Sequence, residues 1–275
     1  MAEASPRADW LRQLRLIPVL MLMNIRGQME YRGAFWIDRV AQIITYGSSF
    51  AVLWILVARF DTLAGWNWAD LALLYSFHML GYSIGASMSF TQMRDLEEHI
   101  RVGTLDVMLI RPMNPWLYLI FSRFNAGYAS HVILGVTLMV WALLNVDIVW
   151  SFGTVLYFVA SLLSAALVTG AIMTMIGATA LVWTRSNHLY SLYFGFWELS
   201  RYPLNIFPAA IQGVMLTIIP LGFMAAVPTA VLLGKPVPLL GNWAAPAALL
   251  AGPVLAGLAA LFWRHGINKY QGAGG

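Results

Sequence analysis

The sequence is dominated by long apolar runs. A helix needs about 20 mostly apolar residues to cross a hydrocarbon layer roughly 30 Å thick. Six runs are candidates for such helices: residues 40–57, 71–90, 117–144, 152–182, 189–199 with their flanks, and 243–263. The fourth is long for one crossing, so it is tilted, extends past the membrane, or is broken near Gly170. We therefore expect an all-α integral membrane protein with six transmembrane helices.

The shortage of charge leads to the same conclusion. Only 10% of the 275 residues are charged, whereas a soluble chain usually carries about 25%. So few charged side chains do not cover the surface of a soluble domain, and lipid must be the solvent for most of it. Cysteine is absent, which excludes disulfides, thiolate metal ligands and a cysteine nucleophile.

The basic residues predict the orientation of the chain. With a cytoplasmic N-terminus and six crossings, thirteen of the sixteen Lys and Arg residues lie on the inner side, and only Arg59, Arg201 and Lys235 lie outside. Basic residues favour the cytoplasmic side of membrane proteins. We therefore expect both termini in the cytoplasm. This placement explains the net charge of +4 without a nucleic-acid partner.

Residues 8–32 are expected to form an amphipathic helix that lies in the inner membrane interface. Its apolar face would carry Trp10, Leu14, Ile17, Met21 and Ile25, and its basic face Arg12, Arg15 and Arg26. Arginines on such a helix lie near anionic lipid headgroups. The alternative is a helix packed on a partner protein.

Residues 202–238 are apolar but interrupted by prolines, which break helices: Pro203, Pro208, Pro220, Pro228, Pro236 and Pro238. Two full crossings here would make seven spans and would place the basic C-terminus outside, against the charge distribution. We expect instead an external re-entrant hairpin before the last span, since irregular backbone at membrane depth is tolerated where protein or water covers it. No internal repeat is evident, so residues 1–275 are expected to form one transmembrane domain.

Just before this hairpin, Glu198 and Arg201 lie three residues apart near the outer end of the fifth span. On a helix this spacing allows an ion pair. The pair either lines a substrate path, hinges the hairpin, or is a self-neutralising structural pair at the interface.

The sequence offers no catalytic, metal-binding or cofactor-binding residues. Residues 81–85 match the G-x-S-x-G pattern of serine hydrolases, but they lie inside a predicted membrane helix. There, Gly81, Gly85 and Ser89 are expected to form a small-residue ridge for close helix packing. The five histidines are scattered, and neither lysine stands in a phosphate-binding loop. Any ATP must therefore be hydrolysed by another chain.

Residues 91–115 concentrate charge in a chain that is otherwise poor in it. Apolar residues flank Gly103 on both sides, which predicts two short amphipathic helices joined by a turn at Gly103-Thr104. A cytoplasmic loop of mixed charged and apolar side chains is suited to docking a soluble partner. The alternative is a solvated linker.

Two segments resemble a known family. The first, IRVGTLDVMLIRPMNP at 100–115, resembles the I-x-x-G-T-L-D-x-x-L-x-R-P-x-N segment of the membrane subunits of type-2 ATP-binding-cassette exporters, in the six-span branch without a fused ATPase. The second is FWELSRYPLNIFP at 196–208 with IIPLGFMAAVPTAVLLG at 218–234, which is similar to the fifth span and external hairpin of that family. With the span order, the resemblance covers nearly the whole chain.

The resemblance implies roles for two groups of residues. In the 91–115 coupling loop, the residues that dock the ATPase would be Glu97, Glu98, Arg101, Gly103, Thr104, Leu105 and Asp106. In the outer segment, the prolines Pro203, Pro208 and Pro220 and Phe207 would shape the external gate, next to Glu198 and Arg201.

The resemblance also implies partners. Two copies of a soluble ATPase would bind ATP and magnesium, and a second permease, identical or related, would complete the transporter in the cytoplasmic membrane of a bacterium. The apolar spans and few fixed charges favour an amphipathic or lipid-like cargo. The main alternative is an ion-coupled secondary transporter. An intramembrane hydrolase that relies on Ser83 and a non-transporting scaffold are further alternatives.

Overall fold

The computed structural model describes residues 6–60, 62–111, 113–183 and 186–272, with side chains from Leu16 onward except at positions 53, 56, 57 and 60. Within these ranges the regular structure is helical, apart from an isolated bridge between Leu63 and Trp66. The all-α prediction is confirmed. The longer helices are α1 (Pro6–Gln28), α2 (Arg32–Phe60), α3 (Trp68–Ser87), α8 (Ala129–Leu143), α9 (Phe152–Ala178), α11 (Asn187–Leu199) and α14 (Ala244–Lys269).

Helices occupy all the predicted spans, but only some of these helices are long and apolar enough to cross a membrane. Three helical stretches of the described chain do so: Ala126–Leu143, Phe152–Trp183 and Gly241–Lys269. A fourth is possible if the bent pair Ala209–Thr217 and Leu221–Leu232 counts as one span. At 1.5 Å per residue, the 13 residues of α11 are about 20 Å long, too short to cross alone. The count of six crossings therefore stays a prediction.

The N-terminal helix is close to its expected bounds. α1 ends at Gln28, and α2 begins at Arg32 after a short turn. The predicted apolar and basic faces depend partly on Trp10, Arg12, Leu14 and Arg15, whose side chains lie outside the described residues, as does Arg185 of the predicted inner loop. The interfacial position of α1 stays a prediction.

The expected continuous helix over 117–144 is wrong. The chain forms α7 (Pro115–Ser122), leaves the helical path at residues 123–125, and continues as the 3-10 turn η1 (Ala126–Tyr128) and α8. A break of this kind leaves carbonyl oxygens without the backbone amide donors that a continuous helix would supply. It is tolerated because side chains from elsewhere bind those oxygens.

Three amide side chains supply these hydrogen bonds. Asn24 and Gln28 of α1 donate to the carbonyls of Ser122 and Phe124, the second over 2.7 Å. Gln92, which is fully buried, donates to the carbonyls of Ile120 at 3.2 Å, Arg123 at 3.0 Å and Ser87 at 3.1 Å. The broken backbone is thus held by α1 on one side and by Gln92 on the other.

The fourth predicted span has no break near Gly170. α9 runs through that position without interruption and ends at Ala178, and α10 (Ala180–Trp183) follows directly. The whole stretch from Phe152 to Trp183 is 32 residues long, about 48 Å as a helix. It therefore extends beyond the hydrocarbon layer unless it is tilted.

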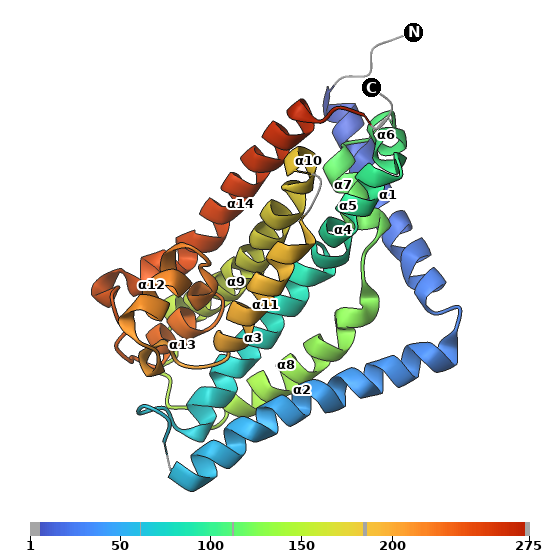
Figure 1. Ribbon diagram of the computed structural model, residues 1–275. Helices are drawn as coiled ribbons and strands as arrows, with labels where there is room; N and C mark the ends of the chain where they lie inside the picture. The colour runs from blue at the N-terminus through green and yellow to red at the C-terminus, as the bar shows by residue number, and fades with distance from the viewer. Residues whose placement is uncertain (1–5, 61, 112, 184–185, 273–275) are drawn as a thin grey trace.

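α3 is the most deeply buried helix of the bundle. It begins at a capping box in which Asn67 and Asp70 each accept a backbone amide hydrogen bond from the other, at 2.9 and 3.0 Å. It packs against α8 and α9, and α9 packs in turn against α14 (Figure 1). A methyl group on Gly85 would lie 2.7 Å from the Thr169 side chain, so glycine permits this close approach. The small-residue packing role is confirmed at Gly85.

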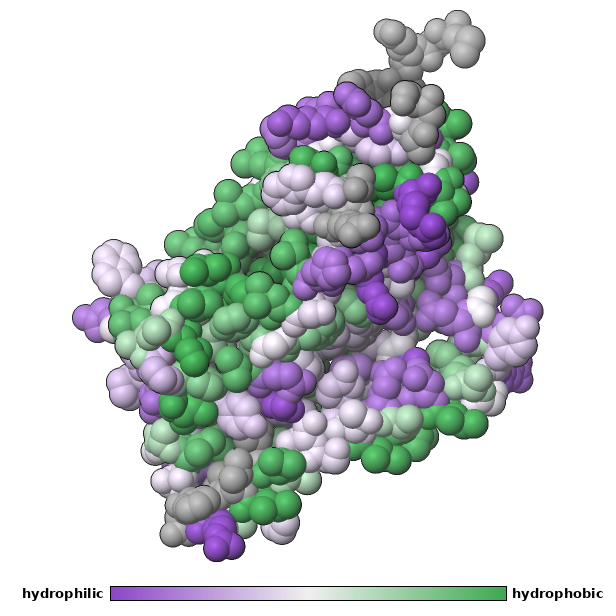
Figure 2. Space-filling view, in the orientation of Figure 1, coloured by the Kyte–Doolittle hydropathy of each residue, from purple (hydrophilic) through white to green (hydrophobic). Residues whose placement is uncertain are grey.

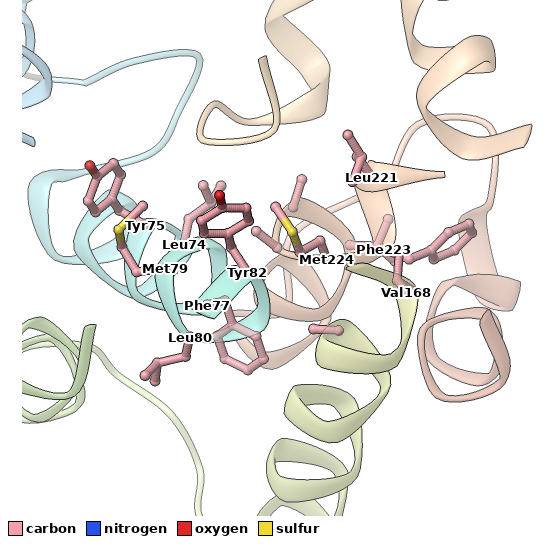
Figure 3. Packing of buried hydrophobic residues seen from close by; sticks show 14 of the residues in the cluster. Leu74, Tyr75, Phe77, Met79, Leu80, Tyr82, Val168, Leu221, Phe223 and Met224 are labelled. Atoms are coloured by element: carbon pink, nitrogen blue, oxygen red, sulfur yellow. The ribbon is translucent and has the colours of Figure 1, made fainter. Parts of the chain in front are cut away.

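The segment after α11 folds back into this core. The main buried cluster joins side chains of α3 and α9 to those of the 3-10 turn η3 (Leu221–Phe223) and the residue that follows it, as Figure 3 shows for Phe77, Leu80, Val168, Leu221, Phe223 and Met224. The short helix α13 (Ala226–Leu232) is likewise almost wholly buried.

The molecule has two distinct ends. α5 (Leu96–Arg101), α6 (Thr104–Leu109), α7 and α10 gather at one end with the start of α1 and the end of α14 (Figure 1). α12 (Ala209–Thr217) and α13 lie at the other. The coupling loop and the proline-rich segment are thus separated by the length of the bundle.

We expect Gln92→Leu to destabilise the fold. It removes the donor for three carbonyls, and an unsatisfied buried acceptor costs about 1–3 kcal/mol. Thermal unfolding in mild detergent should show a clear loss of stability. Gln212→Leu is the matched control, because the described bond of its amide is to one carbonyl, that of Phe207. Equal melting temperatures for the two variants would contradict the role of Gln92.

Candidate docking site

The coupling loop folds into three short helices. α4 (Phe90–Arg94) leads into α5, and α6 follows after a turn at Gly103. Gly103 has φ +74°, a left-handed conformation that glycine adopts without steric cost. Its amide donates to the carbonyl of Ile100 at 3.2 Å and closes the end of α5. The predicted pair of short helices with a turn at Gly103-Thr104 is confirmed.

A histidine braces this turn. The ring Nδ1 of His99 lies 2.8 Å from the Thr104 hydroxyl, which itself donates to the His99 carbonyl at 3.3 Å. Because that hydroxyl proton is engaged, the ring nitrogen is the donor in the first contact. Burial lowers the pKa of His99, and the positive charge of Arg123 lowers it further, against the opposing effect of nearby carboxylates. The brace is therefore a neutral imidazole near pH 7.

A second hydrophobic core fixes the loop to the bundle. We call it the loop core; it consists of Met93, Leu96, Leu105, Leu119, Ala178, Leu181 and Trp263. Leu105 is only 1% exposed, so it anchors α6 from inside and does not lie on the surface. Since the loop core includes residues of α9, α10 and α14, a displacement of the loop must move those helices.

Glu97 also faces inward. Its carboxylate accepts hydrogen bonds from the backbone amides of Ser186 at 2.8 Å and Asn187 at 3.2 Å, at the start of α11. A negative charge at a helix N-terminus satisfies unpaired amides and interacts favourably with the helix dipole. Glu97 therefore connects α5 to α11, whose far end leads to Glu198 and Arg201.

The surface of the loop is formed by other residues. Glu98 and Arg101 are exposed and form a bidentate ion pair at 2.7–2.9 Å. Thr104 is exposed, whereas Gly103 and Asp106 are half-buried. The apolar side chains that reach solvent are Val102, Val107 and Ile110, the last 83% exposed. We call Glu98, Arg101, Val102, Val107 and Ile110 the exposed loop surface.

Sequence reasoning missed the three apolar members of this surface. The sequence does contain a signal for them. Short helices in a charged segment have too little surrounding protein to bury every apolar side chain, so some of these side chains must face outward. Burial of Leu105 and exposure of Val107 depend on which side of α6 meets the loop core.

The short segment that follows α14 reaches the same end of the molecule. Burial, together with the nearby negative charge of Asp106, raises the pKa of Tyr270. Asp106 thus interacts with the residue that follows α14 and is directed toward the C-terminal segment.

The outer-end residues are brought together by short helical pieces. Glu198 and Arg201 form an ion pair, which confirms the pairing expected from their spacing. Pro203, Pro208 and Pro220 each directly precede a helical piece: η2 (Leu204–Ile206), α12 and η3. Pro203 and Pro220 are buried, whereas Pro208 is exposed and Phe207 is half-buried against Tyr202, 6.5 Å away between ring centres. The bent pair formed by α12 and residues 221–232 turns through 80°.

The described residues include no group of three His, Cys, Asp or Glu side chains placed to hold a metal ion. Ser83, the remaining candidate nucleophile, is fully buried and donates to the Leu80 carbonyl at 3.2 Å. The arrangement is that of a helical bundle with a structured loop at one end.

A family model described as ABC-2 family transporter protein matches residues 43–274. The chain belongs to the ABC-2 transporter family. It is a multi-pass membrane subunit of an ABC transporter, and the ATPase of such a transporter is an associated subunit. No curated protein gives a significant match. The match covers the coupling loop and the whole outer segment, and it begins within α2.

We expect acidification to loosen the coupling loop of this ABC-2 protein. The pKa of His99 lies below its ordinary value of 6.5 in the folded loop, so the opened loop binds the proton more readily. Protonation at Nε2, which is buried and has no hydrogen-bond partner among the described residues, keeps the Nδ1 hydrogen bond to Thr104 but places a charge in a desolvated position. The stability that His99 gives the loop is therefore complete above about pH 6.5 and is lost as the pH falls through the folded pKa. Hydrogen exchange of residues 96–109, corrected for its intrinsic pH dependence, should accelerate under acid. In His99→Gln the extra acceleration should disappear, and its persistence would refute this role for His99.

Proposed function

We propose that this chain exports an amphipathic or lipid-like substrate. Export is driven by ATP hydrolysis in a separate soluble ATPase, which docks on the exposed loop surface. The observation that carries the proposal is a loop with two faces. One face is exposed and mixes a charged pair with apolar side chains, which suits a protein interface. The other is buried in the loop core, so force applied outside reaches α9, α10 and α14.

Two contacts extend this coupling along the bundle. Glu97 joins the loop to the start of α11, and α11 ends beside the Glu198–Arg201 pair. A ligand shifts a conformational equilibrium only by its differential affinity for the two states. ATP bound to the partner would therefore favour one loop position, and α11 would carry that change toward the outer segment.

The proposed assembly contains two permeases, identical or related, and two ATPases that bind ATP and magnesium. α2 supports a lipid or permease contact, because its apolar side chains Trp36, Ile37, Ile44, Trp54 and Ile55 are all exposed. The proposed location is a bacterial cytoplasmic membrane, with α1 in the inner interface and both termini in the cytoplasm. The start of α1 and the end of α14 lie at the coupling-loop end, which supports an even number of crossings.

The outer segment is proposed to be a re-entrant gate. Residues 221–230 are buried throughout, and α13 contacts α3, α9 and α14, so protein covers the irregular backbone as membrane depth requires. The 80° bend and the prolines that precede α12 and η3 support a hairpin that enters and leaves on one side.

We expect Val102→Asp and Ile110→Asp to release the ATPase without unfolding the permease. Both side chains are exposed, so a charge there disturbs the docking surface and leaves the loop core intact. The measurement is affinity purification from native membranes, with quantification of a co-purifying P-loop ATPase. Val149→Asp is the control, because this valine is also exposed and lies beside the end of α13 at the opposite end. If no ATPase accompanies the unaltered chain, the ion-coupled alternative takes its place.

The neighbouring glutamates allow a test of transmission. Glu97→Ala removes the cap of α11, an effect worth about 0.5–2 kcal/mol, and should lower substrate transport while ATPase binding is retained. Glu98→Ala alters the exposed loop surface instead, so it should lower transport only as far as it lowers ATPase binding. Co-purified ATPase and transport in reconstituted vesicles give both quantities. Equal transport per bound ATPase in the two variants would rule out the path through α11.

A further inference from the structure

A cleft of about 510 Å³ opens between α2, α4, α8 and α11, apart from the exposed loop surface. Figure 2 shows a hollow between the first half of α2 and the rest of the molecule, with hydrophilic residues along its rims. The volume is typical of small-molecule sites. The residues that determine its chemistry are Arg39 and Gln42 of α2, Tyr82 of α3, Arg94 of α4 and His131 of α8.

Positive charge exceeds negative charge in this cleft. The lining contains two arginines, Arg39 and Arg94, but a single carboxylate, Asp38. Asp38 pairs with one terminal nitrogen of Arg39, while the Nε and the other terminal nitrogen are buried without a hydrogen-bond partner among the described residues. No described carboxylate lies within ion-pair distance of Arg94. An anion would satisfy both arginines.

The break in the third predicted span determines where the Arg39 side chain lies. Gly127 lies directly against the Arg39 guanidinium: a methyl group there would stand 2.7 Å from Nη1 and 3.0 Å from Nη2. The Arg39 position therefore requires both the non-helical path of residues 123–125 and the absence of a side chain at 127. The Arg39 guanidinium is therefore packed against the backbone at Gly127, unlike an arginine on an open surface.

An aromatic wall continues the cleft beyond the arginines. His131 is 4% exposed, and neither ring nitrogen has a hydrogen-bond partner among the described residues. Its ring packs 4.2 Å from that of Tyr46, 5.3 Å from Tyr128 and 5.9 Å from Tyr82, measured between ring centres. Buried polar atoms are normally paired, so this histidine is also directed toward a missing ligand.

We infer that this cleft binds an anionic amphiphile, with its acidic headgroup at Arg39 and Arg94 and its apolar body along Tyr46, Tyr82 and Tyr128. The inference rests on the proposed function in taking this ligand as the cargo. A cation is disfavoured by the excess of arginine, and a purely apolar ligand leaves the arginines and His131 unpaired. The cleft lies close to the coupling loop through Arg94 of α4, so the ligand binds near the elements that the ATPase moves.

Binding is tested with the purified transporter in nanodiscs of zwitterionic lipid. The probe is radiolabelled dodecyl phosphate, with empty nanodiscs for the partition background. Dodecylphosphocholine has the same tail without net charge, and inorganic phosphate has the headgroup without the tail. We expect saturable binding of dodecyl phosphate, displaced poorly by either competitor.

The variants locate the site. Arg39→Gln and Arg94→Gln should each weaken dodecyl phosphate binding about tenfold or more, the effect of losing a charged hydrogen bond. Gly127→Ala should weaken it by displacing Arg39. The matched control is Arg59→Gln, an exposed arginine at the far end of α2, which should change nothing. Since Arg94 is exposed, its variant tests the site even if Arg39→Gln folds poorly.

The outcomes separate the sources of the ligand. Enrichment of anionic phospholipid with the unaltered chain, lost in Arg94→Gln, identifies a membrane lipid as the ligand. Dodecyl phosphate binding without such enrichment identifies a water-borne amphiphile. Equal affinity for dodecylphosphocholine, full displacement by inorganic phosphate, or unchanged binding in both arginine variants would overturn the inference. Co-purification of the ATPase does not depend on these binding results. The proposed function can therefore fail or hold independently of this inference.

Discussion

Backbone carbonyl and amide groups at membrane depth have no water to bind, so each needs a partner inside the protein. This requirement is met most clearly where the third predicted span breaks. Gln92 from α4, with Asn24 and Gln28 from α1, satisfies the freed carbonyls of Ile120, Ser122, Arg123 and Phe124. These hydrogen bonds hold α1, α4 and the two halves of the broken span together.

Both functional regions depend on that break. On one side, Arg123 of the broken segment forms an ion pair with Asp95 at 2.9 Å, between α4 and α5, and so helps to position the coupling loop. On the other, Gly127 lies against the Arg39 guanidinium and allows it to line the cleft. A continuous helix over 117–144 would remove both contacts. The polar residues in this apolar run therefore have a structural purpose.

Several features followed directly from the sequence. Long apolar runs and sparse charge require lipid as the solvent, and the left-handed preference of glycine predicts the turn at Gly103. The spacing of Glu198 and Arg201 predicts their pair. The sequence motif at 100–115 resembles the family to which the family model assigns the chain. These features depend on composition, on local backbone preference or on neighbours a few residues apart.

Other features were decided only by tertiary structure. Leu105 and Val107 are both apolar and two residues apart, yet Leu105 enters the loop core and Val107 faces outward, because α6 packs against α5 and α7 and turns only one side toward the loop core. Glu97 and Glu98 are adjacent, but only Glu97 reaches the start of α11, 89 residues away. The cleft likewise joins side chains from five helices, α2, α3, α4, α8 and α11. The sequence by itself determined that the chain is a helical membrane protein, since hydropathy is a local property, and its motif at 100–115 indicated the family. Which side chains meet depends on contacts between distant segments, which no local pattern encodes.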